Sequence, residues 1–400
     1  MRWIVCAALS LLLAAPTVAQ HDFTDVDRVI EAAVAAEQIP GAVLLVAQDG
    51  VVLHERAFGD AQRFDFGNVP LDPPAAMTTA HVFDVASLTK VMATTLALML
   101  LVDDELVDLD APVHTYLPTF RGAAKDSVTV RHLLSHTSGL MPWEPVYYHA
   151  SNADEALLHI ASLPLAGTVG ERVRYSDLGF MLLGYLVEAV SGQALDAFLD
   201  ERLYGPLGLQ HTSFRPSDGP FAATSHGNPF ERRMVADDTF GYVCDEDPES
   251  FTAWRTYTLV GEVNDGNAHH AHGGVAGHAG LFSTASELNT LMTLWLNEGV
   301  YNSTRYISAG VLKAFLAPHT ATRALGWAVD AGVLGMEGLP KGTFGHTGFT
   351  GTLAVGLAAS GLSIVLLTNR QNLGVASDGR YASLTTLRRH VVRAAVDATR

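Results

Sequence analysis

The chain has 400 residues, 48% of them hydrophobic, and its 42 acidic residues outnumber 25 Lys and Arg to give a net charge of −17 at pH 7. A surface this acidic repels nucleic acid and anionic lipid, so neither is expected as a partner. The length is sufficient for a large hydrophobic core, arranged as one large domain or two lobes.

Residues 1–19 have the pattern of a secretory signal peptide. One basic residue, Arg2, precedes a short apolar core, and the segment ends in small residues at Ala19. The alternative is an uncleaved N-terminal anchor, but the apolar stretch is short for a membrane span. We therefore expect a periplasmic or extracellular protein with no membrane span after signal removal. Cys244 is then the one cysteine of the mature chain, which predicts no internal disulfide.

The first part of the mature chain is predicted to form a helix and a β-hairpin. Apolar residues recur at helical spacing over residues 25–38. Residues 42–47 and 51–57 are expected to pair as strands across an Asp-Gly turn. Residues 58–79, which are rich in Pro and Asp, are expected to form a loop.

The middle of the chain is predicted to be mostly helical, because apolar residues follow helical spacing between breaks rich in Pro, Gly and Asp. Helices are expected, beyond the one that begins near Ser87, over residues 106–117, 128–136, 153–163, 178–204, 286–297 and 309–316. Residues 205–264 show little periodicity and are expected to form long loops.

The last part of the chain returns to strand spacing. Strands are expected over residues 326–329, 342–347, 352–358 and 362–368, followed by a helix over 380–399. The fold class is therefore α+β, with an antiparallel sheet built from both chain ends and covered by the terminal helices. We expect the sheet lobe to comprise residues 24–75 and 320–400, with a mainly helical lobe, 76–319, inserted between them in one domain.

Ser87 and Lys90 open the most apolar stretch of the chain. No charged residue follows Lys90 until Asp103, which predicts a buried helix that begins near Ser87. The two side chains share a helix face because they are three residues apart. A hydroxyl at a helix N-terminus beside an amine in an apolar wall is a candidate nucleophile. The alternative is a simple helix cap, since a Ser-x-x-Lys pair also arises by chance.

Tyr175 precedes a predicted helix, with Ser176 or Asp177 as its possible cap. One interpretation is structural, an N-cap with an aromatic plug. The other is chemical, because a phenol near an ammonium can shuttle a proton while a polar side chain two residues later faces the same cleft.

His346, Thr347 and Gly348 lie on a predicted strand that carries several glycines. Glycine in a strand allows another backbone or a ligand to approach closely. His346 and Thr347 are expected to point to opposite faces of the sheet. The alternative is a β-bulge without function.

These three pieces, in this order, resemble the serine β-lactamase and penicillin-binding protein family, whose signatures include Ser-x-x-Lys and Lys-Thr-Gly. The chain is most similar to the class C β-lactamase-like branch, which also contains D-alanyl-D-alanine carboxypeptidases, esterases and a muropeptide amidase. Residues 129–140 and 274–283 also look like sequences of this family. The resemblance covers roughly residues 25–395.

The resemblance implies a serine hydrolase that forms an acyl-enzyme. Ser87 would attack a carbonyl carbon, with Lys90 as its hydrogen-bonded partner and proton acceptor. Tyr175 would shuttle the proton to the leaving group. The main-chain amides of Ser87 and Phe349 would form the oxyanion hole, in which each donor is worth about 3–4 kcal/mol.

The resemblance also implies substrate-binding roles for Asp177, His346, Thr347 and Gly348. Two of these positions depart from the family pattern. Asp177 replaces the Asn of Tyr-x-Asn, and a carboxylate near Lys90 favours the ammonium, which shifts the role of base toward Tyr175. His346 replaces the Lys of Lys-Thr-Gly, and a neutral imidazole binds a substrate carboxylate less strongly. Arg370 could supply a compensating charge.

We therefore expect an exported serine hydrolase of amides or esters, with peptidoglycan-derived peptides as the first candidate substrate, then esters, then β-lactams. A small molecule or peptide is the expected partner, and no cofactor or metal is expected. A metal site around residues 269–272 and His278 is the less favoured interpretation, because familiar ligand spacing is missing. The alternative from another class is a penicillin-binding receptor that is acylated once and deacylates slowly.

Overall fold

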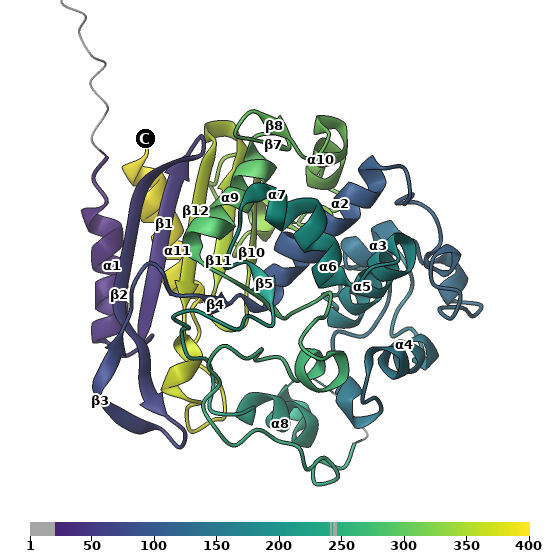
Figure 1. The fold of residues 1–400 in the computed structure, drawn as a ribbon, viewed down its shortest axis with the longest axis horizontal. Helices are drawn as coiled ribbons and strands as arrows, with labels where there is room; N and C mark the ends of the chain where they lie inside the picture. The colour runs from purple at the N-terminus through teal and green to yellow at the C-terminus, as the bar shows by residue number, and fades with distance from the viewer. Residues whose placement is uncertain (1–20, 241, 243–245) are drawn as a thin grey trace, which may run out of the picture.

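The structure is a computed structural model, and it describes residues 21–240, 242 and 246–400. The predicted signal peptide and Cys244 lie outside these residues. Within the described part, seven strands form one antiparallel sheet in the order β3-β2-β1-β12-β11-β10-β9 (Figure 1). The strands are β1 Gly41–Gln48, β2 Val51–Asp65, β3 Val69–Ala76, β9 Ala328–Val329, β10 Thr343–Thr347, β11 Leu353–Leu357 and β12 Leu362–Thr368. The pairing of β1 with β12 joins the two chain ends and confirms the predicted fold class.

Helices cover both faces of the sheet. The terminal helices α1 (Thr24–Ala35) and α11 (Thr385–Ala398) pack on one face, and α9 (Ala285–Leu296) packs on the other (Figure 1). Alternate residues of β1 therefore enter different cores: Leu44 packs with the terminal helices and Leu45 with the inserted region. Burial on both faces explains why β1 and β12 are continuous apolar runs.

The inserted region is mainly helical. Its helices are α2 Thr95–Asp103, α3 Val130–Leu134, α4 Ala153–Ser162, α5 Asp177–Ser191, α6 Leu195–Leu199, α7 Gly205–Leu207, α8 Pro229–Ala236 and α10 Ala309–Leu316. Two small sheets accompany them, formed by β4 Phe83–Asp84, β5 Ser213–Phe214 and β6 Leu281–Ser283, and by β7 Val300–Tyr301 and β8 Thr304–Arg305.

The segment Ala86–Asp103 forms the centre of the inserted region. It contains a 3-10 turn, a π-helical turn Lys90–Thr94 and α2. By length and composition alone this segment could cross a membrane, but 83% of it is buried within the fold. It is therefore the core helix that the sequence predicted.

Three predicted elements are wrong. Residues 58–79 are not a loop, because β2 continues to Asp65 and pairs with β3; prolines are tolerated in β3 because it is an edge strand. Residues 106–117 contain only the 3-10 turn Val113–Thr115, since Pro112 cannot continue a helix. The predicted helix over 178–204 is broken after Ser191, where Gly192 adopts φ +70°.

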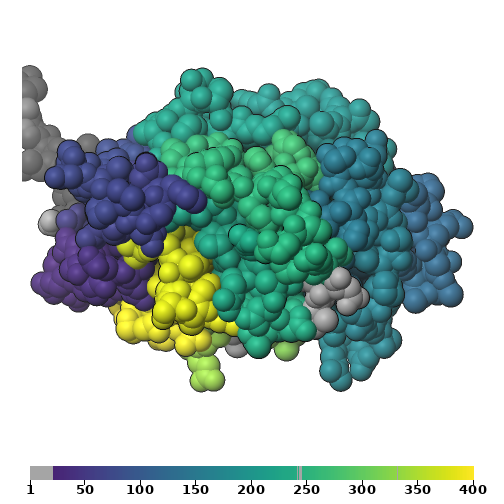
Figure 2. Space-filling model, turned by 90° about the horizontal axis from the view of Figure 1, so that it is seen from below, coloured from purple at the N-terminus to yellow at the C-terminus, as the bar shows by residue number. Residues whose placement is uncertain are grey.

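The C-terminal segment contacts the loops of the inserted region. Figure 2 shows this segment, in yellow, beside the green stretch that includes α8. The rings of Phe230 and Tyr381 stack with their centroids 5.9 Å apart, and Arg380 donates to the Thr239 carbonyl at 3.1 Å. Segments about 150 residues apart in the chain thereby form one wall of the cavity described next.

Candidate active site

Ser87 lies at a strained connection between β4 and the core helix. Ala86 adopts φ +48°, a conformation that is costly for a residue with a Cβ. The carboxylate of Asp84 holds this turn by accepting hydrogen bonds from the main-chain N–H of Ala86 at 2.8 Å and of Asn264 at 2.7 Å. Burial raises the pKa of Asp84 to about 6 although these two bonds oppose the shift. The turn presents the Ser87 side chain to a cavity.

The end of β10 is fastened to the same turn. The Thr350 hydroxyl donates to the Asp84 carbonyl at 2.8 Å, and the Thr352 hydroxyl donates to the Val85 carbonyl at 3.0 Å. A Cβ at Gly348 would lie 2.4 Å from the Val85 carbonyl oxygen, so this position requires glycine. The glycines that the sequence placed on this strand therefore allow the sheet to contact the nucleophile turn.

Lys90 is fully buried directly behind Ser87. Its Nζ donates to Ser87 Oγ at 3.0 Å and to the His278 carbonyl at 3.0 Å, and lies 2.7 Å from Asp177 Oδ1. Burial alone would lower the pKa of Lys90, but the facing Asp177 carboxylate and the nearby Tyr175 oxygen outweigh it and raise this pKa. The amine is therefore held as an ammonium, as the replacement of Asn by Asp177 predicted.

Tyr175 and Asp177 are positioned by the N-terminus of α5. Ser176 is the N-cap, and its hydroxyl accepts from the Gly179 N–H at 3.2 Å. The cap is therefore Ser176, which leaves Asp177 free to pair with Lys90. The Tyr175 ring lies with its centroid 5.0 Å from Lys90 Nζ. The structure thus brings hydroxyl, amine and phenol together.

Two further residues, which the sequence did not single out for this site, surround Tyr175. The His136 ring packs against it with centroids 4.4 Å apart, and the Arg323 guanidinium lies 5.7 Å from its centroid. His136 adopts φ +58° beyond the end of α3, so the helix predicted over residues 128–136 ends before this residue. Burial, helped by the charges of Arg323 and Lys90, holds the pKa of His136 well below its usual value, so this imidazole is neutral.

His346 faces the cavity from β10. Strands β10 and β11 pair in continuous register from Thr343 to Thr347, so the alternative of a β-bulge is wrong. Burial, with the charges of Arg323 and Lys90, holds the pKa of His346 well below its usual value. Its imidazole is neutral at pH 7 and cannot replace the cationic lysine of a Lys-Thr-Gly motif.

A cavity of about 660 Å³ opens over Ser87. Its lining includes these predicted site residues: Ser87, Tyr175, Asp177, His346, Thr347, Gly348 and Phe349. Across the described ranges, no acceptor takes a hydrogen bond from the main-chain N–H of Ser87 or Phe349. Both donors thus remain available to a ligand oxygen.

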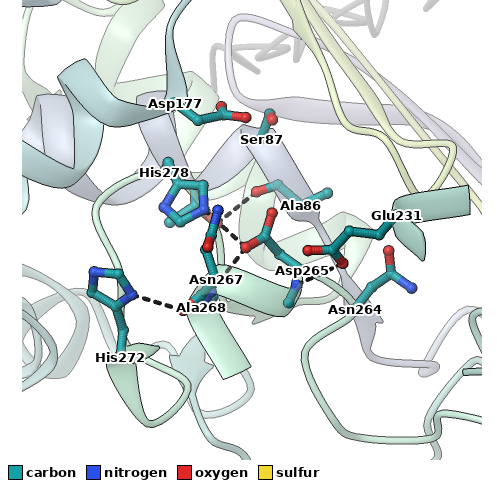
Figure 3. A network of polar contacts seen from close by, with 12 residues as sticks. Ala86, Ser87, Asp177, Glu231, Asn264, Asp265, Asn267, Ala268, His272 and His278 are labelled. Carbon is teal, nitrogen blue, oxygen red and sulfur yellow. Dashed lines mark hydrogen bonds and ion pairs between the residues drawn. The ribbon is translucent and has the colours of Figure 1, made fainter. Parts of the chain in front are cut away.

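One part of the cavity is acidic. Figure 3 shows the carboxyl groups of Glu231 and Asp265 side by side, with Ser87 and Asp177 above them in this view. His278 Nε2 lies 2.9 Å from Asp265 Oδ1, and the carbonyl of the same histidine accepts from Lys90. In the sequence, segment 274–283 stands out only by its family resemblance, and its residue spacing does not predict that His278 contacts Asp265 and Lys90.

The part of the cavity around Tyr175 and Phe349 is basic. Arg370 donates to the Phe349 carbonyl at 2.7 Å, and Arg388 donates to the carbonyls of Gly348 and Thr352 at 2.9 Å. These guanidinium groups brace the turn after β10. For Arg323, by contrast, no side-chain hydrogen bond or ion pair is formed with any residue in the described part of the chain.

The histidines of residues 269–272 do not line the cavity, although Asn264 and Asp265 just before them do. Elsewhere in the described residues, one ligand atom each of Glu144, His149 and His159 lies within 4.8 Å of the others, a spacing that could hold a metal ion. That cluster is also outside the cavity lining.

A sequence model of the Beta-lactamase family matches residues 26–387. The chain belongs to this family. It is 35% identical over 370 residues to an N-acetylmuramyl-L-alanine amidase of Bacillus subtilis (strain 168), covering 88% of this chain and 81% of that protein. The resemblance inferred from the three motifs is therefore confirmed.

Other members of the family agree with this placement. The chain is 33% identical over 357 residues to a protein of Escherichia coli (strain K12) named "Putative D-alanyl-D-alanine carboxypeptidase", covering 84% of this chain and 80% of that one. A penicillin-binding protein homologue from Caulobacter crescentus has the same fold, with a TM-score of 0.68, 20% identity, and coverage of 94% and 97%. The chain is a hydrolase of the β-lactamase and penicillin-binding protein family.

Proposed function

We propose that this β-lactamase family member is an exported serine hydrolase that cleaves amide or ester bonds of peptidoglycan-derived peptides through an acyl-enzyme. The observation that carries the proposal is the 3.0 Å hydrogen bond from buried Lys90 to Ser87 at the base of the cavity. The signal-like N-terminus supports export, and the chemistry requires no metal or organic cofactor. The names of the two relatives support the substrate class.

In the acylation step, Ser87 Oγ attacks the substrate carbonyl carbon, and its proton passes to the Tyr175 oxygen while the phenol passes its own proton on toward the leaving group. The N–H groups of Ser87 and Phe349 stabilise the resulting oxyanion. The bond to the leaving group breaks, and the departing nitrogen or oxygen takes the proton that the Tyr175 hydroxyl gives up. Water then attacks the ester carbonyl through the same groups in reverse, releasing the acid and restoring Ser87.

The different roles of Lys90 and Tyr175 follow from the positive charge of Lys90. Because Asp177 and Tyr175 hold Lys90 as an ammonium, Lys90 is a poor proton acceptor in the resting site. It orients Ser87 Oγ instead and faces the Tyr175 ring from 5.0 Å. Arg323 faces the same ring, so two cations stabilise negative charge that develops on the Tyr175 oxygen during proton transfer.

The neutral His346 makes β-lactams and free D-Ala-D-Ala termini weaker candidates, because both carry a carboxylate. Arg323 is the better compensating cation than Arg370, since the donors of Arg370 already reach the carbonyls of Phe349 and Ala382. An amidase or esterase with modest activity on substrates that carry a carboxylate fits this arrangement best.

A substrate panel tests the proposal. Nitrocefin, p-nitrophenyl acetate, a D-Ala-D-Ala peptide and a muramyl peptide are each assayed with wild type and Ser87→Ala. We expect Ser87→Ala to lower every activity found by at least about 10³-fold. The matched control, Ser286→Ala, removes an exposed hydroxyl on α9 and should change nothing.

The same panel separates the enzyme from a receptor. With a fluorescent penicillin, an enzyme loses the label from Ser87 as the acyl group is hydrolysed. A label that persists for hours, together with no turnover of any panel substrate, would favour the slowly deacylating receptor. Turnover unchanged in Ser87→Ala would overturn the serine mechanism itself.

A further inference from the structure

In the acidic part of the cavity, neither Glu231 nor Asp265 forms an ion pair with a Lys or Arg of the described residues. Three carboxyl groups line the cavity, those of Asp177, Glu231 and Asp265. Asp177 is paired with Lys90. The buried Arg255 donates to Glu262 and to the carbonyls of Val263 and Asn264, so it lies behind the cavity wall.

Asp265 is held rigidly but keeps one oxygen unused. Its Oδ1 accepts from the Ala268 N–H at 2.8 Å and contacts His278 Nε2 at 2.9 Å. Among residues 21–240, 242 and 246–400, no donor forms a hydrogen bond with its Oδ2. Burial opposes ionisation, but the His278 contacts and Ala268 N–H hold the pKa of Asp265 well below its usual value. The group is an anchored carboxylate.

Glu231 places a second carboxyl group beside it. One oxygen, Oε2, accepts from Asn228 Nδ2 at 3.0 Å and from the Gly266 N–H at 3.1 Å. Burial, and then the negative charge of Asp265, raise the pKa of Glu231 to about 8. Two carboxyl groups kept together in a poorly solvated site share a proton at neutral pH, and a bound cation would stabilise the pair in its place.

We propose that Glu231 and Asp265 form a subsite for a primary ammonium group, so that the substrate is a peptide carrying a free amino group at a distance from the reacting carbonyl. This inference rests on the proposed serine hydrolase. A neutral hydroxyl could donate one hydrogen bond to Asp265 Oδ2, but it would bring no positive charge to the Asp265 carboxylate from the cavity side. An ammonium donates to both carboxyl groups and neutralises one charge.

The backbone connects this subsite to the nucleophile. His278 contacts Asp265 through its ring and Lys90 through its carbonyl, and Asn264 N–H donates to Asp84 at the turn before Ser87. A substrate ammonium bound here is therefore held at a set position relative to Ser87, which orients the reacting carbonyl.

The first experiment measures binding without turnover. Pentylammonium and pentan-1-ol, matched in length, are titrated into the full chain by calorimetry and thermal shift, in wild type and Ser87→Ala. We expect pentylammonium to bind at least about 10-fold more tightly than pentan-1-ol in both proteins. Because Ser87→Ala keeps the subsite, this result does not depend on the serine mechanism.

Variants of Glu231 and Asp265 test whether these two carboxyl groups cause the preference for pentylammonium over pentan-1-ol. Glu231→Gln and Asp265→Asn keep the shape of each side chain, and each should reduce the preference for pentylammonium to less than about 3-fold. If Asp265→Asn does not fold, Glu231→Gln alone decides. The control Glu298→Gln, an exposed carboxylate paired with Lys313, should keep the full preference.

Turnover then tests the subsite in catalysis. We expect kcat/KM for p-nitrophenyl 6-aminohexanoate to exceed that for p-nitrophenyl hexanoate by about 10-fold in wild type, with the advantage lost in Glu231→Gln. Equal binding of amine and alcohol in wild type, or a preference that survives in both acid variants, would overturn the subsite. If wild type hydrolyses none of the substrates but still prefers pentylammonium, only the proposed serine hydrolase activity would be overturned.

Discussion

The acidic and basic parts of the cavity use their charges differently. On the basic side, Arg370 and Arg388 donate hydrogen bonds to main-chain carbonyls and hold the turn after β10 in place. On the acidic side, Asp265 is itself held in place by hydrogen bonds yet leaves one oxygen open to the cavity. A charged side chain that stabilises the fold already uses its hydrogen-bonding atoms within the protein. A charged side chain that is held in place but keeps a free hydrogen-bonding atom can bind a ligand. By this criterion Arg323 and the Glu231–Asp265 pair are the recognition groups.

Lys90 lies between the two regions, so its replacement should have the largest effect. Lys90→Met leaves the partly buried Asp177 carboxylate without its cation and Ser87 without its hydrogen-bond donor. We expect kcat/KM to fall by about 10³–10⁴-fold on every substrate that wild type cleaves. Steady-state kinetics measure this, and circular dichroism checks the fold. A loss below 10-fold would contradict the role of Lys90.

Arg388 tests whether the basic side is structural. Arg388→Met removes two charge-assisted hydrogen bonds, to the Gly348 and Thr352 carbonyls, and leaves each carbonyl with only its main-chain donor. We expect the free energy of unfolding to fall by about 2–4 kcal/mol, measured by urea denaturation. The control Arg389→Met, at an exposed position that donates to the Leu334 carbonyl, should cost less than about 1 kcal/mol.

Arg323 tests whether the basic side also recognises an anion. Arg323→Gln removes the one cavity guanidinium that has no bonded partner in the described part of the chain. We expect the ratio of kcat/KM for a D-Ala-D-Ala peptide to that for its methyl ester to fall by about 10-fold, which corresponds to about 1.4 kcal/mol. An unchanged ratio would show that the substrate carboxylate is not bound by Arg323.

Glu231 should make the free energy of unfolding depend on pH, and its replacement has the smallest expected effect of the four substitutions. Its folded-state pKa of about 8 is above the ordinary value of 4.5, so the folded state binds the extra proton and stability falls as pH rises through this interval. Glu231→Gln removes that loss. Relative to wild type, we expect the variant to gain roughly 1 kcal/mol between pH 5 and pH 8.5, since Asp265 shares the titration. Thermal unfolding at both pH values checks the sign.

Much of the sheet could be predicted because its signals are local. The apolar runs of β1 and β12 and the turns beside them are visible in the sequence, and their pairing follows from burial on both faces. The prediction failed where a neighbour decided the outcome. Residues 58–79 form strand structure because β2 and β3 pair with each other, and the prolines are accommodated at an edge.

The candidate site divides in the same way. Ser87 and Lys90 meet because three residues of helix place them on one face, and a spacing of this kind can be read from the chain alone. Asp177 reaches Lys90 from a helix far along the chain, and only the motif resemblance pointed to it.

The sequence alone determined the α+β class, the apolar core helix and the Ser87–Lys90 pair, because each depends on residues within a few positions of one another. Tertiary structure alone decided that Arg323 faces Tyr175, that His278 joins Lys90 to Asp265, and that Glu231 lies beside Asp265. These contacts join segments whose separation carries no periodic signal. Their charges act on one another only because folding removes the water between them.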